Sequence, residues 1–100
     1  MPDIEAAITC KRQAPFFTGY RPAHLVTDDY LTTGVHHYYD AEYIQNGETA
    51  IGTITFISPE AYPNCLWVGK VLRIQEGSKI VGYATVTKIF NEVLNVKEKF

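Results

Sequence analysis

The chain has 100 residues, 46% of them apolar and 20% charged, and its nine Lys and Arg against 11 Asp and Glu give a net charge of −2. This is the length of a single domain, and such a chain buries about two-thirds of its extended surface, so folding requires neither disulfides nor metals. The slightly acidic balance argues against a strongly basic nucleic-acid binder, because neutralised phosphates supply most of that affinity.

The N-terminal segment and the two cysteines indicate where the protein works. Residues 1–10 carry Asp3 and have no basic start followed by an apolar stretch, so they do not resemble a signal peptide. No apolar run approaches the ~20 residues of a membrane helix. We therefore expect a cytoplasmic protein in which Cys10 and Cys65 are reduced and mostly buried, with a disulfide between them as the less favoured alternative.

Alternation of apolar residues predicts a first strand near the N-terminus. Its apolar residues, two positions apart, are Ile4, Ala6, Ile8 and Cys10. Side chains at this spacing share one face of a strand, so we expect this face to be buried. Residues 48–58 predict another strand, because they are rich in β-branched residues and place Ile54 and Phe56 on one face.

Two runs nearer the C-terminus, 66–75 and 79–90, also alternate. One face of the first run is predicted to hold Leu66, Val68, Leu72 and Ile74. One face of the second run is predicted to hold Ile80, Gly82, Ala84 and Val86. The polar break QEGSK between the two runs predicts a hairpin, in which Gly77 supplies a positive φ.

The remaining segments read as turns and a tail. Gln45–Glu48, QNGE, predicts a turn, and Ser58–Asn64 predicts a loop because it contains two prolines. Residues 91–100 predict either a short helix or a frayed end. Short strands separated by turns indicate a small barrel or sandwich. We therefore predict one all-β domain over residues 1–100, with its core at about 3–90 and a tail at 91–100.

No grouping of residues indicates catalysis. The chain contains neither a Walker-type phosphate loop nor a dinucleotide-binding glycine motif. Ser58 and Ser78 are the only serines, and both stand in turn-like contexts outside any nucleophile elbow. Asp28 and Asp29 are adjacent and read as turn residues, so nothing places two carboxylates against one substrate. We expect no enzyme activity and no cofactor, and an enzyme of unrecognised type is the minor alternative.

A metal site is not predicted either. The candidate ligands show no zinc-finger spacing: His24, His36, His37, Cys10 and Cys65. His36 and His37 are adjacent, so on a strand they face opposite sides and do not readily bind one ion. We expect one of these two histidines to be exposed and the other to be partly packed.

Two segments resemble a known family. Pro15–Pro22, PFFTGYRP, is similar to the segment that begins the third, C-terminal domain of bacterial elongation factor Tu. RIQEGSKIVGYATVTKI, which starts at Arg73, is similar to the AIREGGRTVGAGVVTKI of that family. Shorter matches follow in order between these two segments, at Thr33–Gly34, Asn46–Glu48 and Ser58–Pro59.

The resemblance covers residues 3–89 and implies a six-stranded antiparallel, Greek-key-like β-barrel. The GTPase domain and second barrel of the family have no counterpart in these residues, so the resemblance implies a non-enzymatic module. In the family, the loop that carries Gly-Tyr-Arg lies near the face that packs against the GTPase domain. The resemblance therefore makes Gly19, Tyr20 and Arg21 the expected partner-binding residues.

A second working surface of the family's third domain touches the T-stem of aminoacyl-tRNA. The matching residues that this chain keeps are Thr33, Glu76 and Gly77, which the resemblance makes the expected RNA-binding residues. Ala23 and Ser58 stand where the family commonly has a glutamine and a basic residue. Since each lost phosphate contact lowers affinity, we expect any tRNA binding to be weak.

The opening motif also has a plain structural interpretation. Alternation places one of Phe16 and Phe17 in the core and leaves the other to be covered elsewhere. Gly19 predicts a tight bend, and Pro22 restricts Arg21 to extended geometry, which aims the guanidinium outward. Arg21 is thus the residue that folding explains least, and we expect it to contact a partner or to enter a buried ion pair.

Five aromatic residues outside the motif form a further candidate surface: Tyr38, Tyr39, Tyr43, Tyr62 and Trp67. Exposed Tyr and Trp favour recognition, because they bring a large contact area at low entropic cost. The alternative is that half of them face the core, and alternation allows only one of Tyr38 and Tyr39 to point inward.

These expectations favour a binding module of the translation apparatus. It mimics or modulates elongation factor Tu by contacting a GTPase domain or a protein that binds the factor. One alternative is a decoy or antitoxin for a toxin that docks on the factor, and another is a weak tRNA- or RNA-binding domain. The oligomeric state stays open, because Trp67 and the tyrosines suit a homodimer face equally well.

Overall fold

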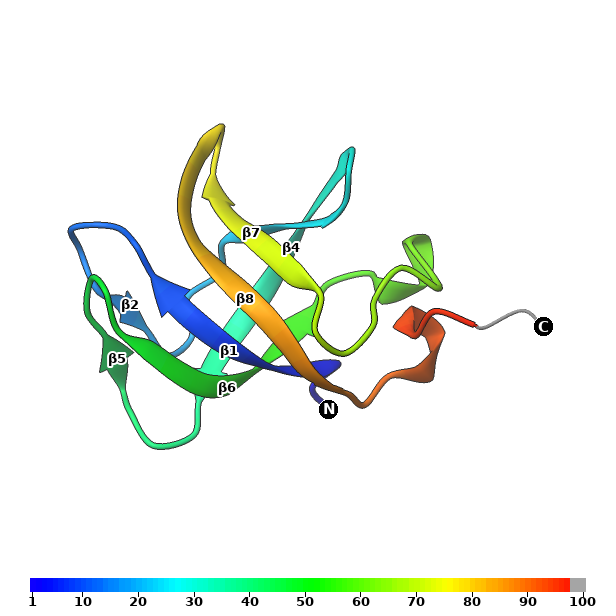
Figure 1. Ribbon diagram of the computed structural model, residues 1–100, viewed down its shortest axis with the longest axis horizontal. Helices are drawn as coiled ribbons and strands as arrows, with labels where there is room; N and C mark the ends of the chain where they lie inside the picture. Colours follow the sequence, from blue (N-terminus) through cyan, green and yellow to red (C-terminus); the bar gives the residue numbers. More distant parts are fainter. Residues whose placement is uncertain (98–100) are drawn as a thin grey trace.

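Six antiparallel strands close into a barrel, as the sequence predicts. The computed structural model describes residues 1–97 (Figure 1). The barrel strands are β1 Ile4–Cys10, β3 Ala23–Thr27, β4 Tyr30–Tyr38, β6 Thr49–Phe56, β7 Val71–Glu76 and β8 Lys79–Ile89. They neighbour one another in the order β1-β6-β4-β3-β7-β8 around the closed barrel. The predicted all-β class and the six-stranded antiparallel barrel are confirmed.

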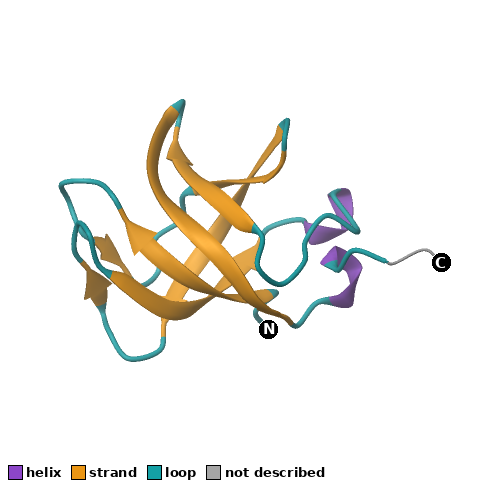
Figure 2. Ribbon diagram, in the orientation of Figure 1, coloured by secondary structure: helices purple, strands orange, loops and turns teal. Residues whose placement is uncertain are grey.

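Smaller elements cover the two ends of the barrel (Figure 2). At one end β2, Phe16–Phe17, pairs with β5, Tyr43–Ile44. At the other end lie two one-turn 3₁₀ helices, η1 Pro59–Ala61 and η2 Glu92–Leu94. Among the residues that the structure describes, none of the helices has the length and apolarity needed to span a membrane.

The interior is filled by the alternating side chains that the sequence predicts. Ile4, Ala6, Ile8 and Cys10 of β1 are fully buried, and so is Ile54 of β6. Within residues 1–97, every buried side-chain nitrogen or oxygen has a hydrogen-bond partner. The core therefore combines apolar packing with a satisfied set of polar groups, and the surfaces available to a partner lie outside and at the ends.

The predicted face of β8 is wrong at one residue, because the strand contains a bulge. Ile74 of β7 pairs with Gly82, whereas the next residue, Gln75, pairs with Ile80. Val81 is the extra residue, and an extra residue reverses the alternation on one side of the bulge. Val81 is therefore fully buried and Ile80 is exposed.

A turn interrupts the run that precedes β7. The backbone N–H of Lys70 donates to the carbonyl of Trp67 at 3.1 Å, and Gly69 between them has a φ of +98°. Val68 lies in this turn and is 64% exposed, so its predicted place on a buried face is wrong. Leu66, before the turn, is fully buried.

The predicted hairpin and turns are confirmed. Gly77 joins β7 to β8 with a φ of +62°. In the turn before β6, the N–H of Glu48 donates to the carbonyl of Gln45 at 2.9 Å. Asp28 and Asp29 form the turn between β3 and β4.

The segment after β8 packs against the barrel end instead of fraying. Leu94 is fully buried, and its carbonyl accepts the N–H groups of Cys65 and Leu66 at 3.0 and 2.8 Å. The N–H of Val96 donates to the carbonyl of Leu66 at 2.8 Å. The core therefore extends beyond the predicted boundary at residue 90. The last three residues of the predicted tail, 98–100, lie outside the described part of the chain.

Asp3 fastens three segments together at this end of the barrel. Its side chain is 6% exposed, and its Oδ2 accepts the N–H of Phe56 at 2.7 Å while its Oδ1 accepts the side-chain amide of Asn91 at 2.8 Å. Its carbonyl accepts the N–H groups of Phe90 and Asn91 at 2.9 and 3.0 Å. The start of β1, the end of β6 and the segment after β8 are thereby held by one residue.

Gly82→Ala is expected to destabilise the barrel by about 1–3 kcal/mol through overpacking. A Cβ at this position would lie 2.3 Å from the carbonyl oxygen of Thr9 and 3.0 Å from the ring of Phe16. Because the Thr9 oxygen belongs to the neighbouring strand, relief requires β1 and β8 to separate. Urea denaturation measures the loss, with Thr85→Ala on the outer face of the same strand as the control. Equal losses in the two variants would contradict the steric explanation.

Candidate functional site

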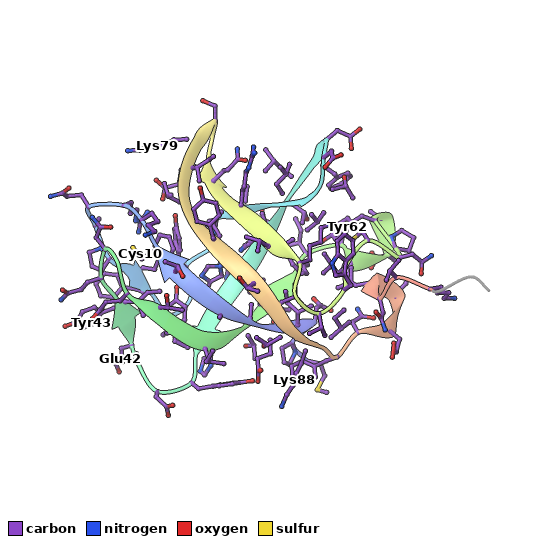
Figure 3. All side chains as sticks on the ribbon, viewed as in Figure 1. Cys10, Glu42, Tyr43, Tyr62, Lys79 and Lys88 are labelled. Carbon is purple, nitrogen blue, oxygen red and sulfur yellow. The ribbon has the colours of Figure 1, made fainter. Side chains whose placement is uncertain are left out.

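The motif Pro15–Pro22 lies at the barrel end that carries β2 and β5. Phe16 is fully buried, whereas Phe17 is 57% exposed, so the predicted division between the two rings is confirmed. The ring centroid of Phe17 lies 5.6 Å from that of Tyr43, which Figure 3 labels at this end of the molecule. The exposed phenylalanine is therefore partly covered by an exposed tyrosine of β5.

Backbone hydrogen bonds hold the loop after β2 alongside β4. Gly19 forms the predicted bend with a φ of +89°, and its N–H donates to the carbonyl of His36 at 2.7 Å. The N–H of His36 donates to the carbonyl of Tyr20 at 2.9 Å, and the N–H of Gly34 donates to the carbonyl of Pro22 at 3.2 Å. The course of the loop is thus fixed on both sides of the predicted partner-binding arginine.

Arg12 braces this loop, although sequence reasoning did not single it out. Its guanidinium carbon lies 4.4 Å from the ring centroid of Tyr20 and 5.0 Å from that of Phe16. Its Nε and Nη2 donate to the carbonyls of Ala14 and Pro15, both at 2.9 Å. Arg12 precedes the motif in a polar break between strands. The sequence signal for its role was a cationic residue only a few positions before aromatic ones.

Tyr20 and Glu76 complete the cluster. The Tyr20 hydroxyl accepts a hydrogen bond from Nη1 of Arg12 at 3.0 Å and donates to Oε2 of Glu76, which also forms an ion pair with Arg12. Burial raises the pKa of Tyr20, and the hydrogen bond to Glu76 raises this pKa further. The hydroxyl therefore stays protonated and serves as a fixed donor rather than as a base. We call Arg12, Tyr20 and Glu76 the brace.

Arg21 is not part of the brace. It is exposed, and its guanidinium makes no hydrogen bond or ion pair with any residue in the range 1–97. The expected alternative of a buried ion pair is therefore wrong, and the outward direction predicted from Pro22 is confirmed. The three predicted partner-binding residues thus differ: Gly19 bends the chain, Tyr20 is half-buried in the brace, and Arg21 presents a charge to solvent.

The predicted RNA-binding residues lie on β4 and at the hairpin between β7 and β8. Thr33 faces outward on β4 opposite Ala23 of β3, which in turn lies opposite Gln75 of β7. The carboxylate of Glu76 turns to the barrel end, where the brace engages it. Gly77 is exposed in the hairpin turn.

Two histidines far apart in the sequence meet inside the barrel. Nε2 of His24 lies 2.8 Å from Nε2 of His36, and both side chains are fully buried. His37 is exposed, so the predicted divergence of the adjacent histidines is confirmed, although His36 is more deeply buried than expected. Sequence reasoning missed the pair, because the 11 residues between its members include a turn, and no local pattern sets the register of the two strands that the turn joins.

One arrangement of protons satisfies every member of this buried chain. His24 donates from Nδ1 to the carbonyl of Thr32 at 3.4 Å, and Nε2 of His36 donates to Nε2 of His24. The hydroxyl of Tyr38 then donates to Nδ1 of His36 at 2.9 Å. Both rings are neutral, and burial lowers the pKa of His24 from 6.5 to about 4 and holds that of His36 well below its ordinary value.

The five candidate aromatic residues do not form one recognition surface. Tyr38 and Tyr62 are buried inside the barrel, where Tyr62 shares a 3.0 Å hydrogen bond with the hydroxyl of Thr32. Tyr39, Tyr43 and Trp67 are exposed. The expected surface is thus wrong for two of its five members, and alternation at Tyr38 and Tyr39 is confirmed.

The two cysteines are unpaired, and the metal-ligating side chains of the described residues form no cluster of three or more. Cys10 and Cys65 are both buried free thiols, and burial raises the pKa of Cys65. In the part of the chain that the structure describes, no three side chains of His, Cys, Asp or Glu are grouped so that they hold a metal ion.

Arg12→Met is expected to lower the free energy of unfolding by about 1–3 kcal/mol. The change keeps much of the apolar stem but removes the ion pair to Glu76 and the hydrogen bonds to two carbonyls. Chemical denaturation at low and high salt measures the loss, of which the ion-pair part shrinks as salt rises. Arg73→Met, at an exposed arginine outside the brace, is the control, and equal losses in both variants would contradict the bracing role.

The fold agrees with the barrel that the sequence motifs imply, and no known protein-family model matches this chain. Several families use small six-stranded barrels, so the fold by itself identifies none of them. The resemblance to the third domain of elongation factor Tu continues to rest on the motifs Pro15–Pro22 and Arg73–Ile89.

Proposed function

We propose that this chain is a non-enzymatic protein-binding module that resembles the third domain of elongation factor Tu. It acts by contacting a GTPase domain or a factor-binding protein of the translation apparatus. Contact is made through the loop that contains Gly19, Tyr20 and Arg21.

The main observation in support of this proposal is the exposed guanidinium of Arg21. The backbone on both sides of Arg21 is bonded to β4, and Tyr20 beside it is fixed by Arg12 and Glu76. A residue held in this way loses little backbone freedom on binding, so more of the contact energy appears as affinity. Arginine is also among the residues that most often dominate the energy of protein interfaces.

The geometry favours a protein partner over RNA. The carboxylate of Glu76 is occupied by the brace, and Thr33 lies on the outer wall, separated from β7 by β3. The net charge of −2 supplies no general attraction for phosphates. Weak tRNA binding is therefore treated as a competing outcome of the test below.

The test is a binding measurement with purified elongation factor Tu. The chain is immobilised and exposed to the full-length factor in its GDP and GTP states, and then to a bacterial lysate whose retained proteins are identified by mass spectrometry. Arg21→Ala is compared with Lys88→Ala, which removes an equal charge from the far end of β8 (Figure 3).

We expect the chain to retain the factor or one of its binding proteins, with at least about tenfold weaker retention by Arg21→Ala and no change for Lys88→Ala. Retention that is equal for both variants, or no retention of any translation component, would refute the proposal. A gel shift with tRNA at low salt that is stronger than the binding to the factor would favour the RNA alternative.

A further inference from the structure

A row of outward-facing side chains, of which Leu25 is partly buried, crosses the outer wall of four neighbouring strands. Leu31 of β4 lies opposite Leu25 of β3, Leu25 lies opposite Arg73 of β7, and Arg73 lies opposite Tyr83 of β8. These side chains face outward, because the residues next to them along the strands are directed into the core. Leu31 is 43% exposed, so the row offers apolar area to solvent.

Two more apolar side chains extend this row toward the start of β7. Val71 shares the outer face of β7 with Arg73, and the ring of Trp67 lies 4.5 Å from Nζ of Lys70. Both Val71 and Trp67 are about half exposed, at 56% and 47%. We call this set the β3–β7 patch: Leu25, Leu31, Trp67, Val71, Arg73 and Tyr83. Its content of Trp, Tyr and Arg is typical of interface centres.

A shallow hollow in the patch holds charges of both signs. The hollow has a volume of about 350 Å³, and Asp28, Lys70 and Arg73 contribute to its lining. The ammonium of Lys70 is already bound by the carbonyls of Val26 and Cys65, at 2.6 and 2.7 Å. Asp28 and Arg73 border the same hollow but pair neither with each other nor with any other described residue.

We propose that the β3–β7 patch binds a second copy of this chain across a two-fold axis. In a two-fold interface each residue that contacts a second residue is contacted by it in return, so a face must complement itself. The patch and its hollow together meet this condition, because Arg73 and Asp28 are an unpaired cation and an unpaired anion with apolar side chains around them. Arg73 of each copy pairs with Asp28 of the partner subunit, while the apolar side chains are buried between the two walls.

Sedimentation equilibrium over a range of about 10–500 µM tests this proposal, a range suited to a modest interface. The wild-type chain is expected to rise with concentration from the 11.3 kDa monomer toward twice that mass. Arg73→Glu places two acids against each other in both charge pairs of the dimer, and Asp28→Arg places two arginines against each other. Each variant alone is expected to associate at least tenfold more weakly than the wild type.

An equimolar mixture of the two variants provides the sharpest result. In a mixed pair both contacts become favourable again, since Glu at position 73 meets Arg at position 28 and the native Arg73 meets the native Asp28. We expect the mixture to dimerise while each variant alone stays monomeric. Circular dichroism of each variant confirms that the exposed substitutions leave the fold intact.

Two results would overturn the proposal: a wild-type chain that stays monomeric at every concentration, or a mixture that does not recover association. The proposal is independent of the function inferred above. Arg21→Glu is expected to leave the dimer unchanged while weakening retention of the elongation factor, so failure of one proposal is distinguishable from failure of the other.

Discussion

Lowering the pH from about 7.5 to about 4 is expected to reduce the free energy of unfolding by at least about 3 kcal/mol, through the buried histidine pair. His24 and His36 are neutral in the fold, and no solvent reaches their rings. A fall in the pKa of His24 from 6.5 to about 4 corresponds to about 3 kcal/mol. His36 acts in the same direction, because its pKa is also lowered by burial and by the neighbouring ring.

The direction of this effect follows from proton binding. Between the lowered pKa of the folded state and the ordinary 6.5 of the unfolded state, the unfolded chain binds more protons than the folded chain. The contribution of the histidine pair to the free energy of unfolding is therefore fully present above about pH 6.5, and it is lost as the pH falls toward 4. Most carboxylates have ordinary pKa values near or below this window, so histidines dominate its upper part.

Urea denaturation at half-unit pH intervals measures the profile. The control is His37→Gln, because His37 is exposed on the same strand and its loss is expected to leave the profile unchanged. The double variant His24→Leu and His36→Leu is expected to flatten the profile between pH 6.5 and 4.5, whatever its absolute stability. A wild-type profile that is already flat in this window would contradict neutral burial of the pair.

Asp3→Ala is expected to destabilise the chain by about 3–5 kcal/mol. The substitution leaves the N–H of Phe56 and the amide of Asn91 without acceptors, and hydrogen bonds to a charged group contribute about 1.5–3 kcal/mol each. It also leaves a void where the carboxylate packs, at a point where three segments meet. Thermal and chemical denaturation both measure the loss.

Two variants separate the role of the Asp3 carboxylate from its volume. Asp3→Asn has nearly the same shape but replaces one acceptor oxygen with an NH₂ group that faces a donor, so it is expected to cost nearly as much. Asp28→Ala, at an exposed turn aspartate, is expected to change stability by less than about 0.5 kcal/mol. A cost for Asp3→Ala as small as that for Asp28→Ala would show that Asp3 does not fasten the barrel end.

The parts of the fold that local patterns dictate were predictable from the sequence. Alternation placed the buried face of β1 correctly, because a strand with one face in the core has a period of exactly two. Gly77 was predictable as the hairpin turn, since few other residues adopt a positive φ without strain. The identification of the barrel as closed and six-stranded came from the resemblance, because alternation alone does not distinguish a barrel from a sandwich.

The errors arose where contacts between distant segments override a local pattern. The bulge at Val81 is set by the pairing of β8 with β7, and its effect on Ile80 has no signal within β8 itself. Leu94 is buried because the N–H groups of Cys65 and Leu66 donate to its carbonyl. Helix propensity, a local property, does not predict such a contact between distant segments. Val68 carries an apolar side chain into a turn that a neighbouring glycine imposes.

In the candidate site, too, some features were predictable from local sequence and others were not. The outward aim of Arg21 was predictable, because Pro22 acts on its immediate neighbour. The brace and the histidine pair were not, since Arg12 and Glu76 are 64 residues apart and His24 and His36 meet only when β3 and β4 are aligned. Of the RNA-binding residues taken from the resemblance, Glu76 has its carboxylate engaged by Arg12 and Tyr20, a contact with no local sequence signal.

The place of β1 in the barrel has a consequence for how fast the chain folds. β1 pairs with β6 on one side and with β8 on the other, and β8 ends at Ile89. The first of the barrel strands in chain order therefore pairs along one edge with the last of them, and both of its edges are covered only once β8 is in place. Loop closure over such separations is slow, and we expect folding in milliseconds to seconds rather than microseconds. Until β8 pairs with β1, one edge of β1 has unpaired backbone N–H and C=O groups. The molecule is therefore most prone to aggregation before this pairing forms.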